Sequence, residues 1–182
     1  PVPRFSRSPL LGHSTNTAAL LRVNRIYAAQ ERILRLAHEF VKEARADLAR
    51  AVAEGADLPP RIRTVHERPG HASPEYRTLA VPIPQNAEGA SPTVLSGAIA
   101  QYARRRPPTC LMLTLDVVGT DENGKPQPLL IAEARDRLGI RMFMVQPFRV
   151  VDGRIEWQEP IEGGWRDPGE EEMIIDAAFR TG

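Results

Sequence analysis

The sequence has little cysteine, no long apolar run and almost no net charge, and each shortage removes a class of protein. A single cysteine, Cys110, excludes an intramolecular disulfide framework and any multi-cysteine zinc site. It fits a reducing, cytoplasmic location, and since it opens an apolar run we expect a buried strand residue rather than a nucleophile. No apolar run approaches the roughly 20 residues of a membrane span. We therefore expect a cytoplasmic protein with no membrane partner.

The charge balance argues against a nucleic-acid partner. The chain has 24 basic and 23 acidic residues, for a net charge of +1. Proteins dedicated to nucleic acid usually carry a strong basic excess. The arginines of the first third and the acidic run at residues 170–172 are instead typical of a solvated surface.

Signature motifs for cofactors and metals are also missing. There is no glycine-rich nucleotide loop, no phosphate loop and no serine nucleophile elbow in the sequence. His66, Glu67 and His71 lie close together in a proline-rich stretch, but zinc needs further ligands that are not nearby. We expect no cofactor and no metal, and we predict that these histidines lie in a solvated loop.

The chain of 182 residues is long enough for one domain, and its hydrophobic fraction of 42% is enough for a real core. Residues 1–23 are predicted to form an N-terminal arm and residues 24–182 a single domain. Leu20 and Leu21 make the arm too apolar for a disordered tail, so we expect it to dock on its own core or on another subunit.

A long helix is predicted over residues 24–54, with Asn24 as its N-cap and Gly55 as its left-handed end. Apolar residues recur along it at helical spacing and form one face. The face contains Ile26, Ala29, Ile33, Leu36, Phe40, Ala44, Leu48 and Val52. At 1.5 Å per residue the helix would run about 46 Å, which exceeds a compact domain of this size. Part of it should project and pair, most simply with a second copy.

Between the long helix and the second one, the chain is rich in proline. We predict a loop over residues 55–92, interrupted by a short strand at 76–81 that the following prolines confine to a sheet edge. A second helix is predicted over 93–106, capped by Ser91 or Thr93. Its final arginines 104–106 either offset the helix dipole, which we favour, or hold a phosphate or carboxylate.

The remainder of the chain alternates apolar and polar residues as strands do. Strands are predicted at residues 111–117, 129–135, 140–146 and 148–157. The Asp152–Gly153 pair predicts a two-residue hairpin that sets Val150 opposite Ile155 and Phe148 opposite Trp157.

The register of the first hairpin decides which residues share a face of the sheet. If Val118 lies opposite Gln127, one face is wholly apolar and the other mixes apolar and charged residues. This second face carries Met112, Thr114, Asp116, Ile131, Glu133, Arg135, Met142 and Met144. It is either a subunit interface or the wall of a pocket in which Asp116, Glu133 and Arg135 bind a ligand.

These patterns predict an α+β fold in which two helices, one of them long, pack on one face of a four- to five-stranded antiparallel meander sheet. Our first functional hypothesis is a non-enzymatic interaction or assembly protein, homo-oligomeric through the long helix, the arm or the second sheet face. The alternative is a small-molecule-binding domain or enzyme with a carboxylate-containing pocket on that face. Nucleic-acid binding through residues 104–106 is the third and least favoured.

Overall fold

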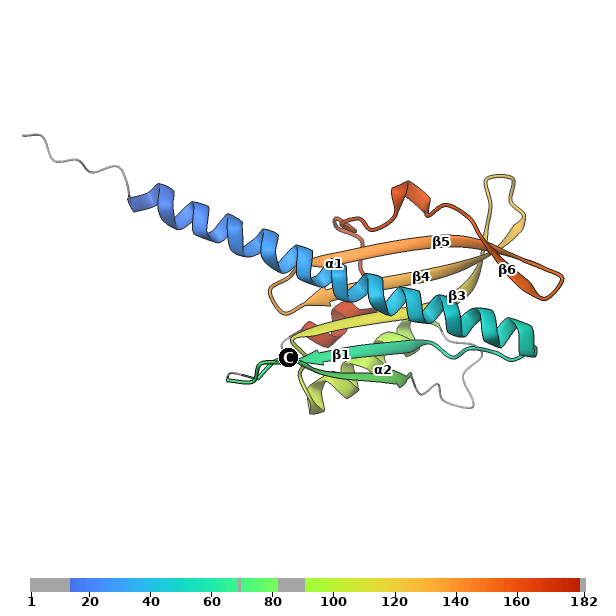
Figure 1. Ribbon diagram of the computed structural model, residues 1–182, viewed down its shortest axis with the longest axis horizontal. Helices are drawn as coiled ribbons and strands as arrows, with labels where there is room; N and C mark the ends of the chain where they lie inside the picture. The colour runs from blue at the N-terminus through green and yellow to red at the C-terminus, as the bar shows by residue number, and fades with distance from the viewer. Residues whose placement is uncertain (1–13, 69, 82–90, 181–182) are drawn as a thin grey trace, which may run out of the picture.

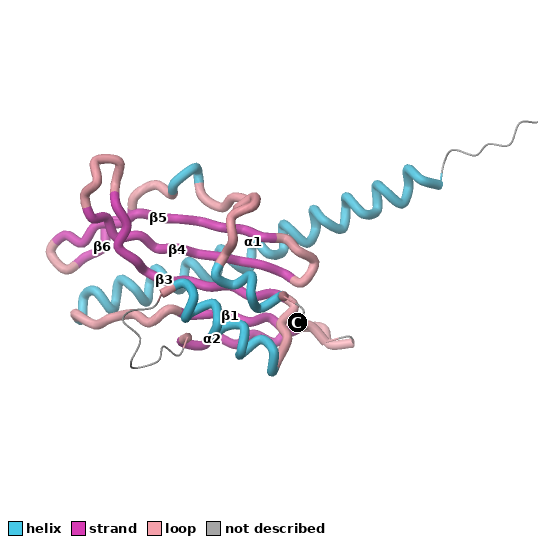
Figure 2. Tube along the Cα trace, turned by 180° about the vertical axis from the view of Figure 1, so that it is seen from behind, coloured by secondary structure: helices cyan, strands magenta, loops and turns pink. Residues whose placement is uncertain are grey.

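The computed structural model describes residues 14–68, 70–81 and 91–180, with side chains described from residue 18 onward. It has three layers, with a long helix on one face of a six-stranded antiparallel sheet and, on the other face, a shorter α-helix and a C-terminal 3₁₀ helix (Figures 1 and 2). The α+β class predicted from the sequence is therefore confirmed. The elements are α1 (Ser14–Glu54), β1 (Arg61–His66), β2 (Glu75–Ala80), α2 (Pro92–Arg105), β3 (Cys110–Thr120), β4 (Pro126–Asp136), β5 (Arg141–Val151), β6 (Arg154–Trp157) and the 3₁₀ helices η1 (Ile161–Gly163) and η2 (Ile174–Phe179).

The sheet has the strand order β2-β1-β3-β4-β5-β6. Strands β3 to β6 form the predicted meander, and β2 is the edge strand predicted at 76–81. The sheet has one strand more than the largest number expected, because residues 61–66 form β1 instead of a loop. Arg61 and Arg63 made this segment look like a polar loop in the sequence. In the structure they neutralise carboxylates on α1. Arg63 pairs with Glu43 at 2.5 Å and Arg61 with Asp47 at 2.6 Å.

Helix α1 begins at Ser14, ten positions before the predicted N-cap at Asn24. The boundary predicted for the N-terminal arm therefore falls inside the helix, and residues 1–13 lie outside the described part of the chain. The predicted end is confirmed: Gly55 follows the helix with a φ of 66°, in the left-handed region that suits glycine. Leu20 and Leu21 do not dock on the core of their own chain, since each is 58% exposed, and docking on another subunit stays a prediction.

The C-terminal part of α1 packs across the middle of the sheet. Ile33, Phe40, Ala44 and Leu48 are each 3% exposed or less, and they meet strand residues such as Met112 and Leu130. Arg45 extends over the ring of Trp157, with 5.4 Å between the guanidinium carbon and the ring centroid. Burial of these apolar side chains is what fixes α1 on the sheet.

Helix α2 lies on the opposite face of the sheet from α1, so the expectation that both helices share one face is wrong (Figures 1 and 2). Leu95 and Ile99 of α2 pack with Leu111, Leu113 and the C-terminal Ile175. The predicted cap at Ser91 is confirmed, because its hydroxyl accepts the Val94 N–H at 3.3 Å. Both faces of the central strands carry buried apolar clusters, and each face is therefore covered by its own helical layer.

The register predicted for β3 and β4 is wrong by one residue. Gly119, not Val118, lies opposite Gln127. The predicted register needs an even number of loop residues, whereas the hairpin closes with the three residues 122–124. Gly124 has a φ of 74°, and the Asp121 carboxylate accepts the N–H groups of Asn123 and Lys125. A slip of one residue moves every side chain of one strand to the other face.

The last hairpin has the register predicted from Asp152 and Gly153. Phe148 lies opposite Trp157 and Val150 opposite Ile155. The aromatic rings of the first pair are 5.3 Å apart between centroids. The two turn residues have φ values of 51° and 72°, as a tight hairpin of this kind requires.

Candidate functional site

The corrected register separates the three predicted site residues. Glu133 lies opposite Leu113 and Arg135 opposite Leu111, so both are on the face covered by α2 and η2. Asp116 lies opposite Leu130 and belongs to the face covered by α1. The three residues therefore cannot form one pocket, and only Glu133 and Arg135 remain neighbours on one strand.

The Glu133 side chain is 3% exposed and holds the start of η2. Its Oε1 accepts the N–H of Ile174 and its Oε2 accepts the N–H of Ile175, each over 3.1 Å. Burial raises the pKa of this carboxyl to about 7, and the two backbone donors only partly oppose the rise. A carboxyl with this pKa is partly protonated near neutral pH.

Asp176 lies beside it and connects two strands to η2. Its carboxylate accepts hydrogen bonds from the Arg135 Nη1 at 2.5 Å, from Arg141 at 2.6 and 3.2 Å, and from the Met173 N–H at 2.9 Å. Burial disfavours its charge, but these donors outweigh burial and hold the pKa of Asp176 below its usual range. Arg141 also donates to the carbonyl oxygens of Gly169 and Glu171.

We call Glu133, Arg135, Arg141 and Asp176 the C-terminal clasp, because their hydrogen bonds tie residues 169–176 to β4 and β5. Both carboxylates are fully engaged by the chain itself. Within the described chain, the one buried polar atom of the clasp that has no partner is Nε of Arg135. The guanidinium of Arg135 is also stacked 5.1 Å from the centroid of the Phe179 ring. The arrangement stabilises the C-terminal segment, because it connects that segment to two strands of the sheet.

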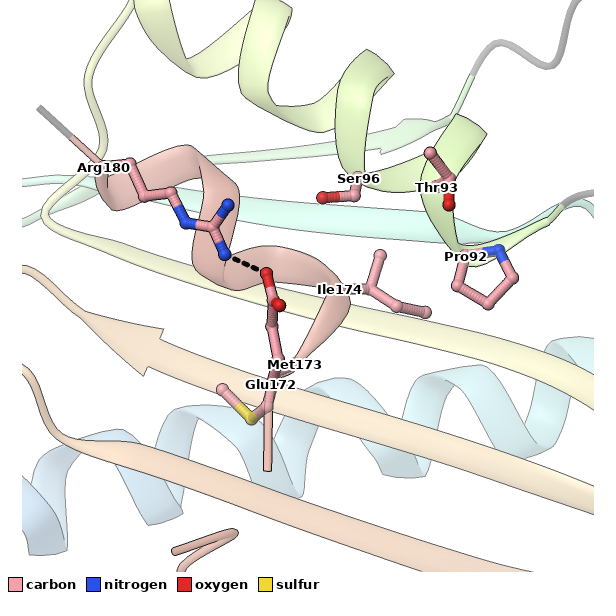
Figure 3. Close-up of a pocket in the computed structure, with 7 residues that line it drawn as sticks. All are labelled: Pro92, Thr93, Ser96, Glu172, Met173, Ile174 and Arg180. Atoms are coloured by element: carbon pink, nitrogen blue, oxygen red, sulfur yellow. Dashed lines mark hydrogen bonds and ion pairs between the residues drawn. The ribbon is translucent and has the colours of Figure 1, made fainter. Parts of the chain in front are cut away.

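Two shallow grooves lie on the surface of the described residues. One, of about 350 Å³, lies between the start of α2 and the C-terminal segment, where Arg180 pairs with Glu172 (Figure 3). The other, of about 650 Å³, is lined by Leu58, Leu115 and Asp116. Partial desolvation and the nearby Asp57 raise the pKa of Asp116, although its side chain is exposed. This second groove places a carboxylate beside apolar side chains.

Several of the large apolar side chains that the described residues expose lie on α1, whose N-terminal part extends beyond the sheet (Figure 1). We call residues 18–28 the free segment, because every one of them is exposed. It carries five large apolar side chains between 45% and 63% exposed. They are Leu20, Leu21, Val23, Ile26 and Tyr27. The sequence pattern indicated a helix that projects in part, and it placed Ile26 on the apolar face of that helix.

The other candidate residues from the sequence, Cys110 and His66, occupy buried positions. Cys110 is buried in β3, as predicted, and burial raises its thiol pKa to about 12. His66 is not in a solvated loop: it ends β1, is 8% exposed and shares a hydrogen bond with Thr64. The described residues contain no group of three or more histidine, cysteine, aspartate or glutamate side chains able to hold a metal.

Sequence reasoning missed Arg141 and Asp176, which complete the clasp. They are 35 positions apart, and neither belongs to a recognisable motif. It also missed Glu75, on which Arg68, Arg77 and Arg106 converge. The strand predicted from residue 76 was the one feature of the sequence that pointed to Glu75, because Glu75 begins this edge strand.

No helix in the described part of the chain has both the length and the apolar character needed to cross a membrane. No protein-family model, curated protein or solved structure matches the sequence or the fold.

Proposed function

We propose that this is a non-enzymatic assembly protein that pairs with a second copy of itself through the free segment of α1. The observation that carries the proposal is the row of large apolar side chains that the free segment exposes. A helical segment as short as residues 18–28 is only marginally stable in water when no other part of the protein packs on it. A partner helix would remove these side chains from water and support the segment.

The spacing of the exposed residues favours a helical partner. Leu20, Val23 and Tyr27 follow one another at intervals of three and four residues. At 3.6 residues per turn these positions form a narrow stripe, which we call the seam. A repeat of this kind is typical of helices that pack side by side, and a second copy presents the same stripe.

The state of the buried polar groups also supports an assembly role over catalysis. The carboxylate oxygens of Glu133 and Asp176 accept hydrogen bonds from backbone N–H groups and arginines of the same chain. A general acid or base must reach a substrate atom within hydrogen-bond distance. These carboxylates are 3% and 6% exposed.

Sedimentation equilibrium on the full chain tests the proposal, with two matched double variants. Leu20→Gln with Tyr27→Gln removes apolar surface from the seam. Leu21→Gln with Ile26→Gln removes a similar amount from outside it. We expect a dimer for the wild type and the control, and a dissociation constant at least about 100-fold higher for the seam variant, since each buried side chain contributes about 1.5–3 kcal/mol. A wild-type monomer at high protein concentration would contradict the proposal.

A second candidate function is small-molecule binding in the groove around Asp116. The specific observation is a carboxylate of raised pKa beside Leu58 and Leu115, at a groove of about 650 Å³. The chemistry suits an apolar ligand that carries an amine. Binding of such ligands that Asp116→Asn abolishes, in a chain whose dimerisation is unaffected, would support this function separately from assembly.

A further inference from the structure

Three arginines from separate parts of the chain converge on one carboxylate. Arg68 follows β1, Arg77 lies on β2 and Arg106 follows α2, and each pairs with Glu75. The nitrogen–oxygen distances are 3.4, 3.2 and 2.7 Å respectively. We call Arg68, Arg77 and Arg106 the arginine cluster. It forms where β2, the loop after β1 and the end of α2 meet.

The cluster has far more positive charge and hydrogen-bonding capacity than Glu75 can satisfy. A guanidinium carries five N–H donors, and among the described residues each of these three spends one on Glu75. The side chains of Arg68 and Arg77 are 62% and 50% exposed, so their remaining donors face solvent. Arg104 and Arg105, which precede Arg106 in the last turn of α2, are also exposed.

The excess charge is also felt by the neighbouring His66. Burial is the main reason that the pKa of His66 lies below its usual value, and the positive charge of Arg106 lowers it further. Glu75 opposes this effect, but the pKa stays lowered. The charge of Arg106 affects His66 more strongly than the charge of Glu75 does, and Arg77 acts in the same direction as Arg106, so the arginines outweigh Glu75 at this position.

We propose that the arginine cluster is a binding site for a compact oligophosphate, that is, two or three linked phosphate groups. Guanidinium groups match phosphate oxygens in pairs and remain charged at every physiological pH. Convergence on a single point favours a compact anion, because an extended nucleic-acid backbone is bound by charges spread along a groove. The site is distant in sequence from the seam and does not depend on the proposed assembly.

Glu75 has a specific role in this site. Its carboxylate holds the arginines together, but it also repels an incoming anion and occupies donors that the anion would use. Removal of a unit charge about 4 Å from a bound anion changes the dissociation constant about five-fold even in water-like surroundings. Replacement of Glu75 by glutamine keeps a hydrogen-bond acceptor and removes the charge. If the cluster is a phosphate site, this variant should bind the oligophosphate more strongly than the wild type. A purely structural ion-pair cluster does not predict this gain in binding.

Isothermal titration of the full chain with inorganic tripolyphosphate tests the site. We expect Glu75→Gln to bind about five-fold more tightly than the wild type. The double variant Arg77→Gln with Arg106→Gln should bind at least about ten-fold more weakly. Arg149→Gln with Arg154→Gln is the matched control, because it removes two exposed charges from the last hairpin. The control should bind as the wild type does.

Absence of tripolyphosphate binding at low ionic strength would overturn the proposal, and so would an equal loss in the two arginine double variants. Circular dichroism checks that each variant is folded. If the cluster variant unfolds, Glu75→Gln decides alone, since unchanged or weaker binding by a folded Glu75→Gln chain contradicts the site. Tighter binding of single-stranded DNA than of tripolyphosphate would also overturn it. Vesicles with and without phosphatidylinositol bisphosphate, compared with free tripolyphosphate, distinguish a lipid headgroup from a soluble source of the same chemistry.

Discussion

Arg141 and Asp176 join β5 to η2 through two hydrogen bonds, one to each carboxylate oxygen. The Nε of Arg141 donates to Oδ1 over 3.2 Å, and its Nη2 donates to Oδ2 over 2.6 Å. The same guanidinium donates to two backbone carbonyl oxygens of residues 169 and 171. One arginine thus positions the whole approach to η2.

Removal of the charge on Asp176 should loosen the C-terminal segment. Asp176→Asn leaves Arg135 and Arg141 without their common partner at a position that is 6% exposed. Breaking a buried pair in this way costs about 3–5 kcal/mol, and we expect a loss near 3 kcal/mol in the free energy of unfolding. Urea denaturation measures it, and hydrogen exchange should show faster exchange at Ile174 and Ile175. The exposed Asp57→Asn is the control, and an equal effect in both variants would disprove the role of the clasp.

The raised pKa of Glu133 predicts a stability that depends on pH. The unfolded chain titrates this carboxyl near 4.5 and the native state near 7, so the native state binds more protons between these values. The contribution of Glu133 to the free energy of unfolding is therefore largest below pH 4.5 and is lost as pH rises through 7, by up to about 3 kcal/mol. Asp176 does not interfere between pH 5 and 8, because its lowered pKa keeps it ionised there.

Glu133→Gln isolates this effect. Glutamine cannot titrate, and its NH₂ group would face one of the two backbone N–H groups that donate hydrogen bonds to Glu133. We expect the variant to be less stable than the wild type at pH 5, with a difference that narrows toward pH 8. Chemical denaturation across that range, with the exposed Glu156→Gln as a control, provides the measurement. A difference that is constant with pH would show that Glu133 does not titrate in this window.

Two glycine-to-alanine substitutions should change stability in opposite directions. Gly97 lies exposed in α2 with nothing within 4 Å of an added methyl group, and Gly97→Ala should stabilise the protein by about 0.5–1 kcal/mol. Gly153 has equal space but a φ of 72°, and Gly153→Ala should destabilise it by about 1–2 kcal/mol. Thermal unfolding of both variants tests this. The same sign in both would contradict the backbone geometry of the last hairpin.

The thiol of Cys110 should be inert in the native protein. It is 1% exposed, and burial raises its pKa to about 12, so almost no thiolate forms near neutral pH. Alkylation by iodoacetamide should proceed only in denaturant, with complete reaction at one site per chain. Rapid modification of the folded chain, at the rate of a free thiol, would place Cys110 at the surface.

The sequence by itself determined the elements that depend on neighbouring residues. The hairpin at Asp152–Gly153, the cap at Ser91 and the end of α1 at Gly55 each follow from a few adjacent positions, and local backbone preferences were sufficient to predict them. The long amphipathic helix and the α+β class followed from periodicity alone.

Tertiary structure decided what lies between these elements. Strand β1 was not predicted, because its arginines make it look like a polar loop, and only the packed structure shows that carboxylates of α1 neutralise them. The order of the strands, the placement of α1 and α2 on opposite faces, and the clasp between Arg141 and Asp176 all join residues far apart in the chain. Such contacts depend on burial and pairing that no local pattern encodes. The register of β3 and β4 is an example, because it differs by one residue from the predicted register. This difference places Asp116 on the other face of the sheet from Glu133 and Arg135.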